Sequence, residues 1–476
     1  MSKEKMDMKK VLAMLSQPKE TPAPLENVER LRLEIPYITK ENKIQKRYVQ
    51  VVMPKIASRP FPLIYIPHYE MGEDAIELRD YLAKGWAVAS PAEFDNSYNG
   101  MLTDDDLVFN NAALYTLRHR KEFDKNRIIL AGGSAGGYMT MMLNGLQLGL
   151  CASIANAPIT NTYFNFQYYF PKANALNLQA LAKIAAQKAA KGEMEAEKSE
   201  KTPLEVMQSL MMVPIPFLAG VAGMFAPIGE NFPDKEDYQR WEAFSAVGIA
   251  ECFCSPIMVN HSTSDILVPV DQISRRYTYE KPGDSLEETF DSRLPKDFPG
   301  KLKNSLEEVL PKKETRVERF EVPEQAEDVN LPYDSTKRFN INIFDDGPVE
   351  GYGSHSARMD VGRRFDVPYL EEMFTKTSAE TCTLTPAMLR RLLIRYQGND
   401  VVLPAHRGAD NQVYGSLEIY RKEVCEELID WTKNHTEDDL AKVFDEVLKE
   451  EEDNNVRMEI KNTMDEILSE VKQGSI

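Results

Sequence analysis

Apolar residues in the first 160 positions follow the two periodicities that separate strands from helices. Residues 31–35 alternate between apolar and polar side chains, which is typical of a strand with one buried face. Continuous apolar runs bounded by turn residues predict buried strands at residues 61–66, 86–90, 127–130 and 152–155. Helical patterns predict helices at residues 74–84, 106–119 and 138–148.

This alternation of strands and helices predicts an α/β protein with a mostly parallel central sheet that is covered by helices on both faces. The rhythm stops near residue 160, and apolar strands resume at residues 256–260 and 338–344. From residue 367 onwards the chain is chiefly helical and closes with amphipathic segments at 438–449 and 457–471. There is no internal repeat.

Four consecutive parts follow from these patterns. Residues 1–160 and 251–375 form the two halves of the core, and the second half holds a charged insertion at 272–335. Residues 161–250 are expected to form a helical cap or lid, and residues 376–476 a helical C-terminal extension. Within the cap, residues 210–229 carry no charge, but three prolines break them, so we expect a buried lid and no membrane span.

The charge of the chain narrows the choice of partners. A formal net charge of -18, from 57 basic and 75 acidic side chains, argues against a nucleic-acid partner, because phosphates require a basic face. Much of the acidity lies at residues 284–327 and 423–470, which is typical of solvated helix faces. The C-terminal helices fit either a packing appendage or a homo-oligomer contact, and the sequence leaves both open.

Five scattered cysteines indicate a reducing compartment, because their number is odd and their spacing does not form a disulfide framework. Cys252 and Cys254 lack partner residues at zinc-ligand spacing, so we expect no metal and no cofactor. The N-terminal apolar piece at residues 11–15 is too short for a signal peptide, and we expect a cytoplasmic protein.

The most informative motif is Gly-Gly-Ser-Ala-Gly-Gly at residues 132–137, which lies between a predicted strand and a predicted helix. That order is typical of a nucleophile elbow, in which the serine has strained backbone angles and its hydroxyl is raised above the sheet. Gly132 and Gly136 are required because a Cβ at either position would clash across the turn. The pattern predicts that Ser134 is the nucleophile of a hydrolase.

A serine hydroxyl needs a base within hydrogen-bond reach, and that base needs an orienting carboxylate. Asp265 follows the buried strand at 256–260 directly and precedes a Val-Pro turn, which suits the carboxylate. A Gly-rich loop after the last core strand ends at His355, which it could deliver to Ser134. Asp271 and Asp345 are weaker candidates for the acid, and His406 is a weaker candidate for the base.

These residues resemble the α/β-hydrolase group that contains serine esterases and prolyl-oligopeptidase-like enzymes. The likeness lies in residues 124–128, the elbow, the Asp265-x-x-Val-Pro block and the late His355, in the order Ser, Asp, His. It covers residues 45–160 and 250–375. The resemblance implies that Ser134 is the nucleophile, His355 the general base and then acid, and Asp265 the orienting carboxylate. Asp265 and His355 are 90 positions apart, a wider gap than the family usually shows, and the charged insertion accounts for the excess.

Two main-chain N–H groups should form the oxyanion hole, one from Ala135 and one from the loop after the third core strand. That loop, residues 68–72, lacks the Gly-Gly run of many esterases. We favour Tyr69, through its main-chain N–H or, as in the peptidase branch, its hydroxyl. A tyrosine that only packs under the cap is the alternative.

Three functions remain open from the sequence. The first is a serine hydrolase that cleaves a small-molecule carboxylic ester, with the apolar cap enclosing an apolar acyl or alcohol group. The second is an aminopeptidase or oligopeptidase for short peptides that uses the same triad, with Glu70 or Glu93 as the anchor for a peptide terminus. The third is a catalytically inactive binding protein, which the presence of all three triad residues disfavours.

Overall fold

The structure is a computed structural model that describes residues 25–55, 57–73, 75–92, 104–169, 235–263, 265, 267–276, 300–321, 332–345, 355 and 366–474. Most of the predicted cap, including the uncharged residues 210–229, lies outside these ranges, as does Glu93. The expected lid therefore stays a prediction. In the described part of the chain, no helix has the length and apolar character needed to cross a membrane.

A nine-stranded sheet forms the centre of the molecule, with the strand order β1-β2-β4-β3-β5-β6-β7-β9-β8. Its strands are β1 (Val28–Ile38), β2 (Ile44–Pro54), β3 (Phe61–Tyr65), β4 (Ala87–Ala92), β5 (Phe123–Gly133), β6 (Ala152–Asn156), β7 (Ile257–Ser262), β8 (Thr315–Glu321) and β9 (Phe339–Asp345). β2 pairs antiparallel with β1 and β4, and all other pairs are parallel. This is the topology of the α/β-hydrolase fold, so the predicted fold is confirmed.

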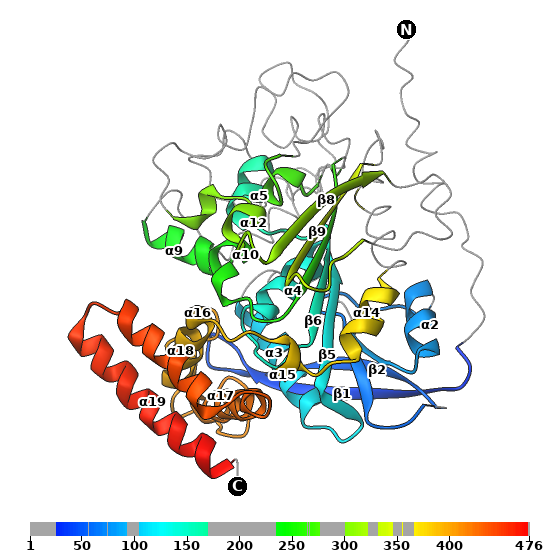
Figure 1. Cartoon of the computed structure of the whole chain (residues 1–476). Helices are drawn as coiled ribbons and strands as arrows, with labels where there is room; N and C mark the ends of the chain where they lie inside the picture. Colours follow the sequence, from blue (N-terminus) through cyan, green and yellow to red (C-terminus); the bar gives the residue numbers. More distant parts are fainter. Residues whose placement is uncertain are drawn as a thin grey trace, which may run out of the picture.

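Helices cover both faces of the sheet (Figure 1). Helices α3 (Asp104–Arg118), α4 (Ala135–Asn144) and α10 (Ala246–Ile249) contribute to the apolar cluster on one face, and α2 (Ile76–Ala83) and α14 (Val367–Phe374) to that on the other. Successive residues of β5 alternate between the clusters, since Ile128 and Leu130 belong to the first and Ile129 and Ala131 to the second.

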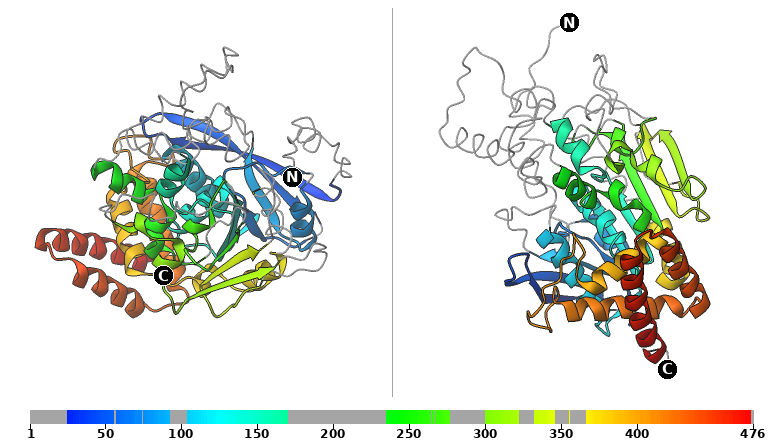
Figure 2. Two further views of the ribbon diagram at one scale, coloured as in Figure 1. Left: turned by 90° about the horizontal axis from the view of Figure 1, so that it is seen from above. Right: turned by 90° about the vertical axis from the view of Figure 1, so that its left-hand side faces the viewer.

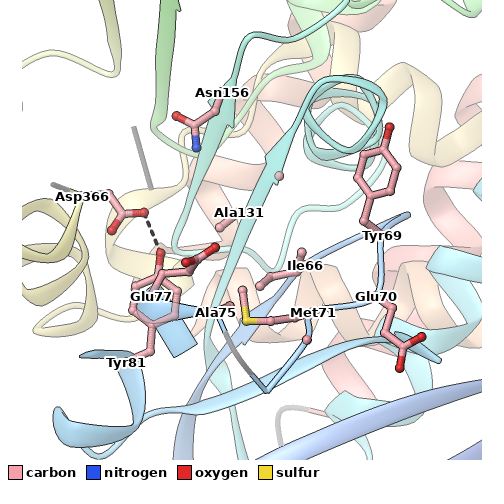
Figure 3. A pocket seen from close by; sticks show the side chains of 12 residues that line it. Ile66, Tyr69, Glu70, Met71, Ala75, Glu77, Tyr81, Ala131, Asn156 and Asp366 are labelled. Carbon is pink, nitrogen blue, oxygen red and sulfur yellow. Dashed lines mark hydrogen bonds between the residues drawn. The ribbon is translucent and has the colours of Figure 1, made fainter. Parts of the chain in front are cut away.

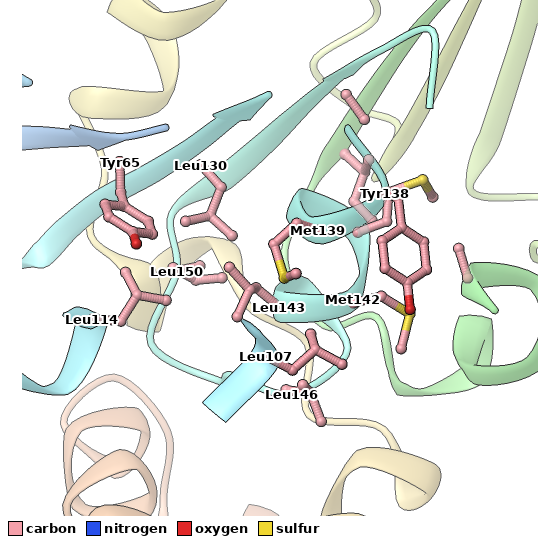
Figure 4. Packing of buried hydrophobic residues seen from close by; sticks show 14 of the residues in the cluster. Tyr65, Leu107, Leu114, Leu130, Tyr138, Met139, Met142, Leu143, Leu146 and Leu150 are labelled. Carbon is pink, nitrogen blue, oxygen red and sulfur yellow. The ribbon is translucent and has the colours of Figure 1, made fainter. Parts of the chain in front are cut away.

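The helix that follows the elbow is buried along its whole length, which explains why its sequence is almost free of polar residues. Figure 4 shows Met139, Met142 and Leu143 of α4 among leucines of α3 and of the segment that follows α4. Each fully buried side chain of this size stabilises the fold by about 2 kcal/mol. The predicted helix at 138–148 ends earlier, at Asn144, where a turn redirects the chain toward β6.

The C-terminal helices lie together beside the core (Figure 2). Their buried side chains form a third apolar cluster. They are α15 (Ser378–Thr381), α16 (Pro386–Gln397), α17 (Leu417–Thr432), α18 (Glu437–Glu450) and α19 (Asn454–Gly474). Leu148 and Cys254 of the core join this cluster. Polar contacts add to the attachment, because Arg395 Nη2 donates to the Leu146 carbonyl oxygen at 2.6 Å and Glu427 accepts from the Leu148 N–H at 3.2 Å.

The charged insertion predicted at residues 272–335 also contributes to the sheet. The 3-10 helix η2 (Val270–Gln272) leads into it, and it contains the 3-10 helix η3 (Lys301–Lys303), helix α12 (Leu306–Val309) and strand β8. β8 pairs with β9 and forms the edge of the sheet. Its sequence, Thr-Arg-Val-Glu-Arg-Phe-Glu, is polar at every position except Val317 and Phe320, as is common for an edge strand, and we did not predict it as a strand. Parts of the predicted cap are helical as well, in α5 (Thr162–Tyr169) and α9 (Lys235–Ala243).

Candidate active site

Ser134 lies in the turn between β5 and α4 with φ 56° and ψ −121°, a conformation that L-residues rarely adopt. The turn is tight enough that a Cβ on Gly132 would lie 2.3 Å from the Gly136 carbonyl oxygen. The Ser134 N–H donates to the Asn156 carbonyl oxygen of β6 at 2.8 Å, which fixes the turn to the sheet. These features are those of a nucleophile elbow.

Asp265 and His355 come together from two different loops. Asp265 follows β7, and His355 lies between β9 and α14. His355 Nδ1 and Asp265 Oδ2 are 2.7 Å apart, and both side chains are buried. Because β5, β7 and β9 belong to one parallel set, their carboxyl ends, which carry the elbow, Asp265 and His355, share one edge of the sheet.

The Asp265 carboxylate is held on both oxygens. Its Oδ1 accepts from the Leu267 and Val268 N–H groups, each at 2.9 Å, and its Oδ2 faces His355. Burial alone would raise the pKa of Asp265, but His355, His261 and the Val268 N–H outweigh it and hold the pKa below its ordinary value. The carboxylate is therefore ionised at neutral pH.

His261 is a second buried histidine at this position, and its place at the same strand end as Asp265 indicated that it shapes the loop and does not react. Its Nε2 lies 2.6 Å from the Val268 carbonyl oxygen and 3.9 Å from Asp265 Oδ2. A carbonyl only accepts, so Nε2 must carry the proton. His261 therefore fastens the same loop whose main chain holds the Asp265 carboxylate.

The loop after β3 has an unusual conformation that the sequence did not reveal. His68 has φ 75°, and the Tyr69 N–H donates to the Pro67 carbonyl oxygen at 3.0 Å, which closes a γ-turn around His68. His68 Nδ1 lies 3.2 Å from Asp106 Oδ2, and Arg47 pairs with the other oxygen of Asp106 at 2.7 Å.

Asp106 is a buried carboxylate with two charged or titratable neighbours. Burial alone would raise its pKa, but His68 and Arg47 together hold the pKa below its ordinary value. The only signal in the sequence is a carboxylate in the first turn of a helix whose other residues are mainly apolar or amide. That signal indicates a buried partner without naming it.

Tyr69 and Ala135, the two residues predicted to supply the oxyanion hole, belong to adjacent segments. A Cβ on Gly136 would lie 3.0 Å from the Pro67 carbonyl oxygen and 3.3 Å from the Tyr69 ring, so the loop lies directly against the start of α4. The Tyr69 main-chain N–H is engaged in the γ-turn. Of the two donors considered for Tyr69, the hydroxyl is therefore the better candidate.

A cavity of about 100 Å³ opens at this edge of the sheet, between the β3 loop, the end of β5 and helix α2 (Figure 3). Its wall contains Tyr69 and Glu70 on one side and Glu77, Tyr81 and Asp366 on the other. The Tyr81 hydroxyl donates to Asp366 Oδ2 at 2.7 Å. The lining also includes Ile66, Met71, Gly72, Ala75, Ala131, Gly132 and Asn156.

The weaker candidates for the acid and the base do not take part in the contact between His355 and Asp265. Asp271 is buried in η2, and Asp345 is the last residue of β9. His406 lies in the loop between α16 and α17, within the C-terminal extension. Over the described ranges, no three His, Cys, Asp or Glu side chains form a group that could hold a metal ion.

No protein-family model matches the chain, and no curated protein matches it. Among solved structures, acylaminoacyl peptidase from Pyrococcus horikoshii is 14% identical, covering 74% of this chain and 43% of its own, with a TM-score of 0.40. Acetyl xylan esterase from Paenibacillus sp. R4 is 13% identical, covering 74% and 86%, with a TM-score of 0.37. Oligopeptidase B from Leishmania major is 13% identical, covering 73% and 36%, with a TM-score of 0.38. This chain spans less than half of the length of the two peptidases.

Proposed function

We propose that this protein is a serine hydrolase that cleaves carboxylic esters through an acyl-enzyme formed on Ser134. The observation that carries the proposal is the 2.7 Å contact between His355 and Asp265, two residues 90 positions apart in sequence. A buried imidazole on a buried carboxylate, at the sheet edge that also bears a strained serine, has the composition of a hydrolytic triad.

In this proposal each residue has one task. The Asp265 carboxylate accepts a hydrogen bond from His355 Nδ1–H, which leaves Nε2 unprotonated as the base that takes the Ser134 hydroxyl proton. Ser134 Oγ attacks the acyl carbonyl carbon, and the Ala135 N–H and the Tyr69 hydroxyl stabilise the oxygen that becomes negative. His355 then returns the proton to the departing alcohol. Water, activated by the same imidazole, releases the acid and restores the serine.

Peptide cleavage with the same residues is the second candidate, and one observation favours it. Glu70 lies in the cavity wall beside Tyr69, where a carboxylate could bind the ammonium group of a peptide. The reaction would proceed through the same acyl-enzyme, with an amine as the leaving group. Substrate comparison separates the two candidates.

The test combines covalent labelling with turnover. A fluorophosphonate probe should label the wild-type protein and leave Ser134→Ala unlabelled, while Ser378→Ala, which alters a buried serine of α15, should label normally. Rates on p-nitrophenyl acyl esters and on aminoacyl-nitroanilides then distinguish an esterase from a peptidase. Equal labelling of wild type and Ser134→Ala would refute the proposal.

A further inference from the structure

Three asparagines form a hydrogen-bonded row across the sheet, on the face covered by α2 and α14. Asn156, Asn260 and Asn342 lie directly opposite one another on β6, β7 and β9. Asn342 Nδ2 donates to Asn260 Oδ1, and Asn260 Nδ2 donates to Asn156 Oδ1, each at 2.9 Å. Every member is at most 1% exposed. Polar side chains are costly to bury in this way, so the row needs an explanation.

Arg316 of the edge strand β8 sets the direction of this row. Its Nη1 donates to Asn342 Oδ1 at 2.9 Å and also reaches the Pro332 carbonyl oxygen at 3.1 Å. A guanidinium group has no acceptor, so the oxygen of the Asn342 amide must face Arg316 and its nitrogen must face Asn260. The same constraint passes to Asn260 and then to Asn156. The Arg316 guanidinium at one end of the row thus determines the orientation of the Asn156 amide at the other end.

The atom presented is the amide nitrogen of Asn156. The Asn156 Oδ1 is occupied by Asn260, so its NH₂ group is directed away from the row. Within the described ranges, the side-chain hydrogen bond of Asn156 is the one that its Oδ1 accepts from Asn260, and the residue is 99% buried. Asn156 lines the cavity beside the elbow, and Figure 3 shows its nitrogen pointing into that space.

The surroundings of this donor define what it could bind. The main-chain oxygen of Asn156 accepts the Ser134 N–H at 2.8 Å, so the backbone of Asn156 is adjacent to the residue proposed as the nucleophile. Glu70, Glu77 and Asp366 line the same cavity, and their carboxylates would repel an anionic acceptor. A neutral carbonyl oxygen fits both the donor and this environment.

We propose that Asn156 is a substrate-binding residue that donates a hydrogen bond to a second, neutral carbonyl oxygen of the substrate, such as the amide of an acylated amino-acid ester. This assignment rests on the proposed function. Asn260, Asn342 and Arg316 are positioning residues that orient the amide of Asn156. Polarisation along the row strengthens its terminal N–H.

The first experiment compares two esters whose acyl chains have equal length. p-Nitrophenyl N-acetylglycinate carries the second carbonyl, and p-nitrophenyl pentanoate lacks it. The ratio of their kcat/KM values should fall five- to tenfold in Asn156→Leu and in Asn156→Asp, as expected for one hydrogen bond of about 1 kcal/mol. The ratio should fall two- to threefold in Arg316→Met, because the row loses the cation that fixes its direction.

Asn340→Asp is the matched control, because Asn340 is a buried asparagine of β9 that contacts the turn at Asp334 and Lys337. Its substitution should leave the ratio unchanged. If both Asn156 variants fail to fold, the ratio measured for Arg316→Met tests the proposal, because the Arg316 side chain is partly exposed. Unchanged ratios in folded Asn156 or Arg316 variants would overturn the proposal.

A second readout does not depend on turnover. N-acetylglycine methylamide should bind Ser134→Ala, measured by calorimetry, with a Kd five- to tenfold lower than for Ser134→Ala/Asn156→Leu. If the wild type hydrolyses neither ester but this difference is present, the proposed function fails and the role of Asn156 stands. Equal Kd values, or no binding to Ser134→Ala, would overturn the role of Asn156.

Discussion

Replacing Asp265 with asparagine tests the proposed triad at its most constrained point. The Leu267 and Val268 N–H groups both donate to Oδ1, and an NH₂ group cannot accept them. The new amide must therefore keep its oxygen on the loop and turn its nitrogen toward His355 Nδ1. His355 then has to accept at Nδ1 and carry its proton on Nε2, the tautomer that cannot act as a base toward Ser134.

The expected loss is about 10⁴-fold in kcat for ester hydrolysis, the order of effect that an imposed wrong tautomer has in another serine hydrolase. This corresponds to about 5.5 kcal/mol of activation free energy, at roughly 1.36 kcal/mol for each factor of ten. Steady-state rates on p-nitrophenyl esters measure the loss, and ¹⁵N NMR of the histidines reports the tautomer.

Asp271→Asn is the matched control, because Asp271 is a buried acid in the same region and was a weaker candidate for the triad. It should retain activity within about threefold of the wild type. Near-wild-type turnover in Asp265→Asn would refute the reasoning. Loss of turnover in Asp271→Asn would then identify Asp271 as the triad acid. Thermal melting of both variants shows whether they are folded.

Four further outcomes are expected. Ser134→Ala and His355→Ala should each reduce turnover by several orders of magnitude, and the double variant should cost little more, since the triad acts as a unit. Tyr69→Phe should lower kcat about 10²-fold with little change in KM if the hydroxyl stabilises the oxyanion; an unchanged kcat would exclude the hydroxyl. Gly132→Ala should yield misfolded or inactive protein by circular dichroism and activity, because its Cβ would lie 2.3 Å from the Gly136 oxygen. Burial raises the pKa of Glu423 to about 7, so the folded state binds this proton more tightly than the unfolded chain and stability should fall as pH rises from about 5 through 7. Glu423→Gln should remove that slope, which urea midpoints at pH 5 and 8 measure.

The fold was predictable because its signals are local. Buried parallel strands appear as apolar runs, and a Gly-x-Ser-x-Gly turn between a strand and a helix has few other uses. The contact of His355 with Asp265 was also anticipated, because carboxyl ends of parallel strands must share an edge. Its consequences for catalysis remain proposals that the variants above test.

Contacts between distant segments could not be predicted in the same way. β8 was interpreted as part of a charged insertion, since its alternating Arg and Glu residues look like a solvated segment. The role of Arg316 depends on its contact with Asn342 of β9, which is not visible in the sequence. The role of Asp106 depends in the same way on its contacts with His68 and Arg47. Single-sequence patterns contain no information on which polar residue will face which.

Backbone strain is concentrated where the proposed chemistry lies. Three residues other than glycine and asparagine have positive φ in the described part of the chain, namely His68, Ser134 and Ala157, and each closely follows a strand at its carboxyl end. Such conformations cost about 1 to 3 kcal/mol each and persist only where surrounding contacts enforce them.

Here two asparagines enforce two of the three strained positions. The main-chain oxygens of Asn156 and Asn260 accept the N–H groups of Ser134 and Ala157 at 2.8 and 2.7 Å. The side chains of the same two residues form the row that ends at the cavity. The conformation of the proposed nucleophile and the direction of the proposed substrate donor are therefore fixed by one set of side-by-side strands. A change in the register of β6 against β7 would disturb both at once.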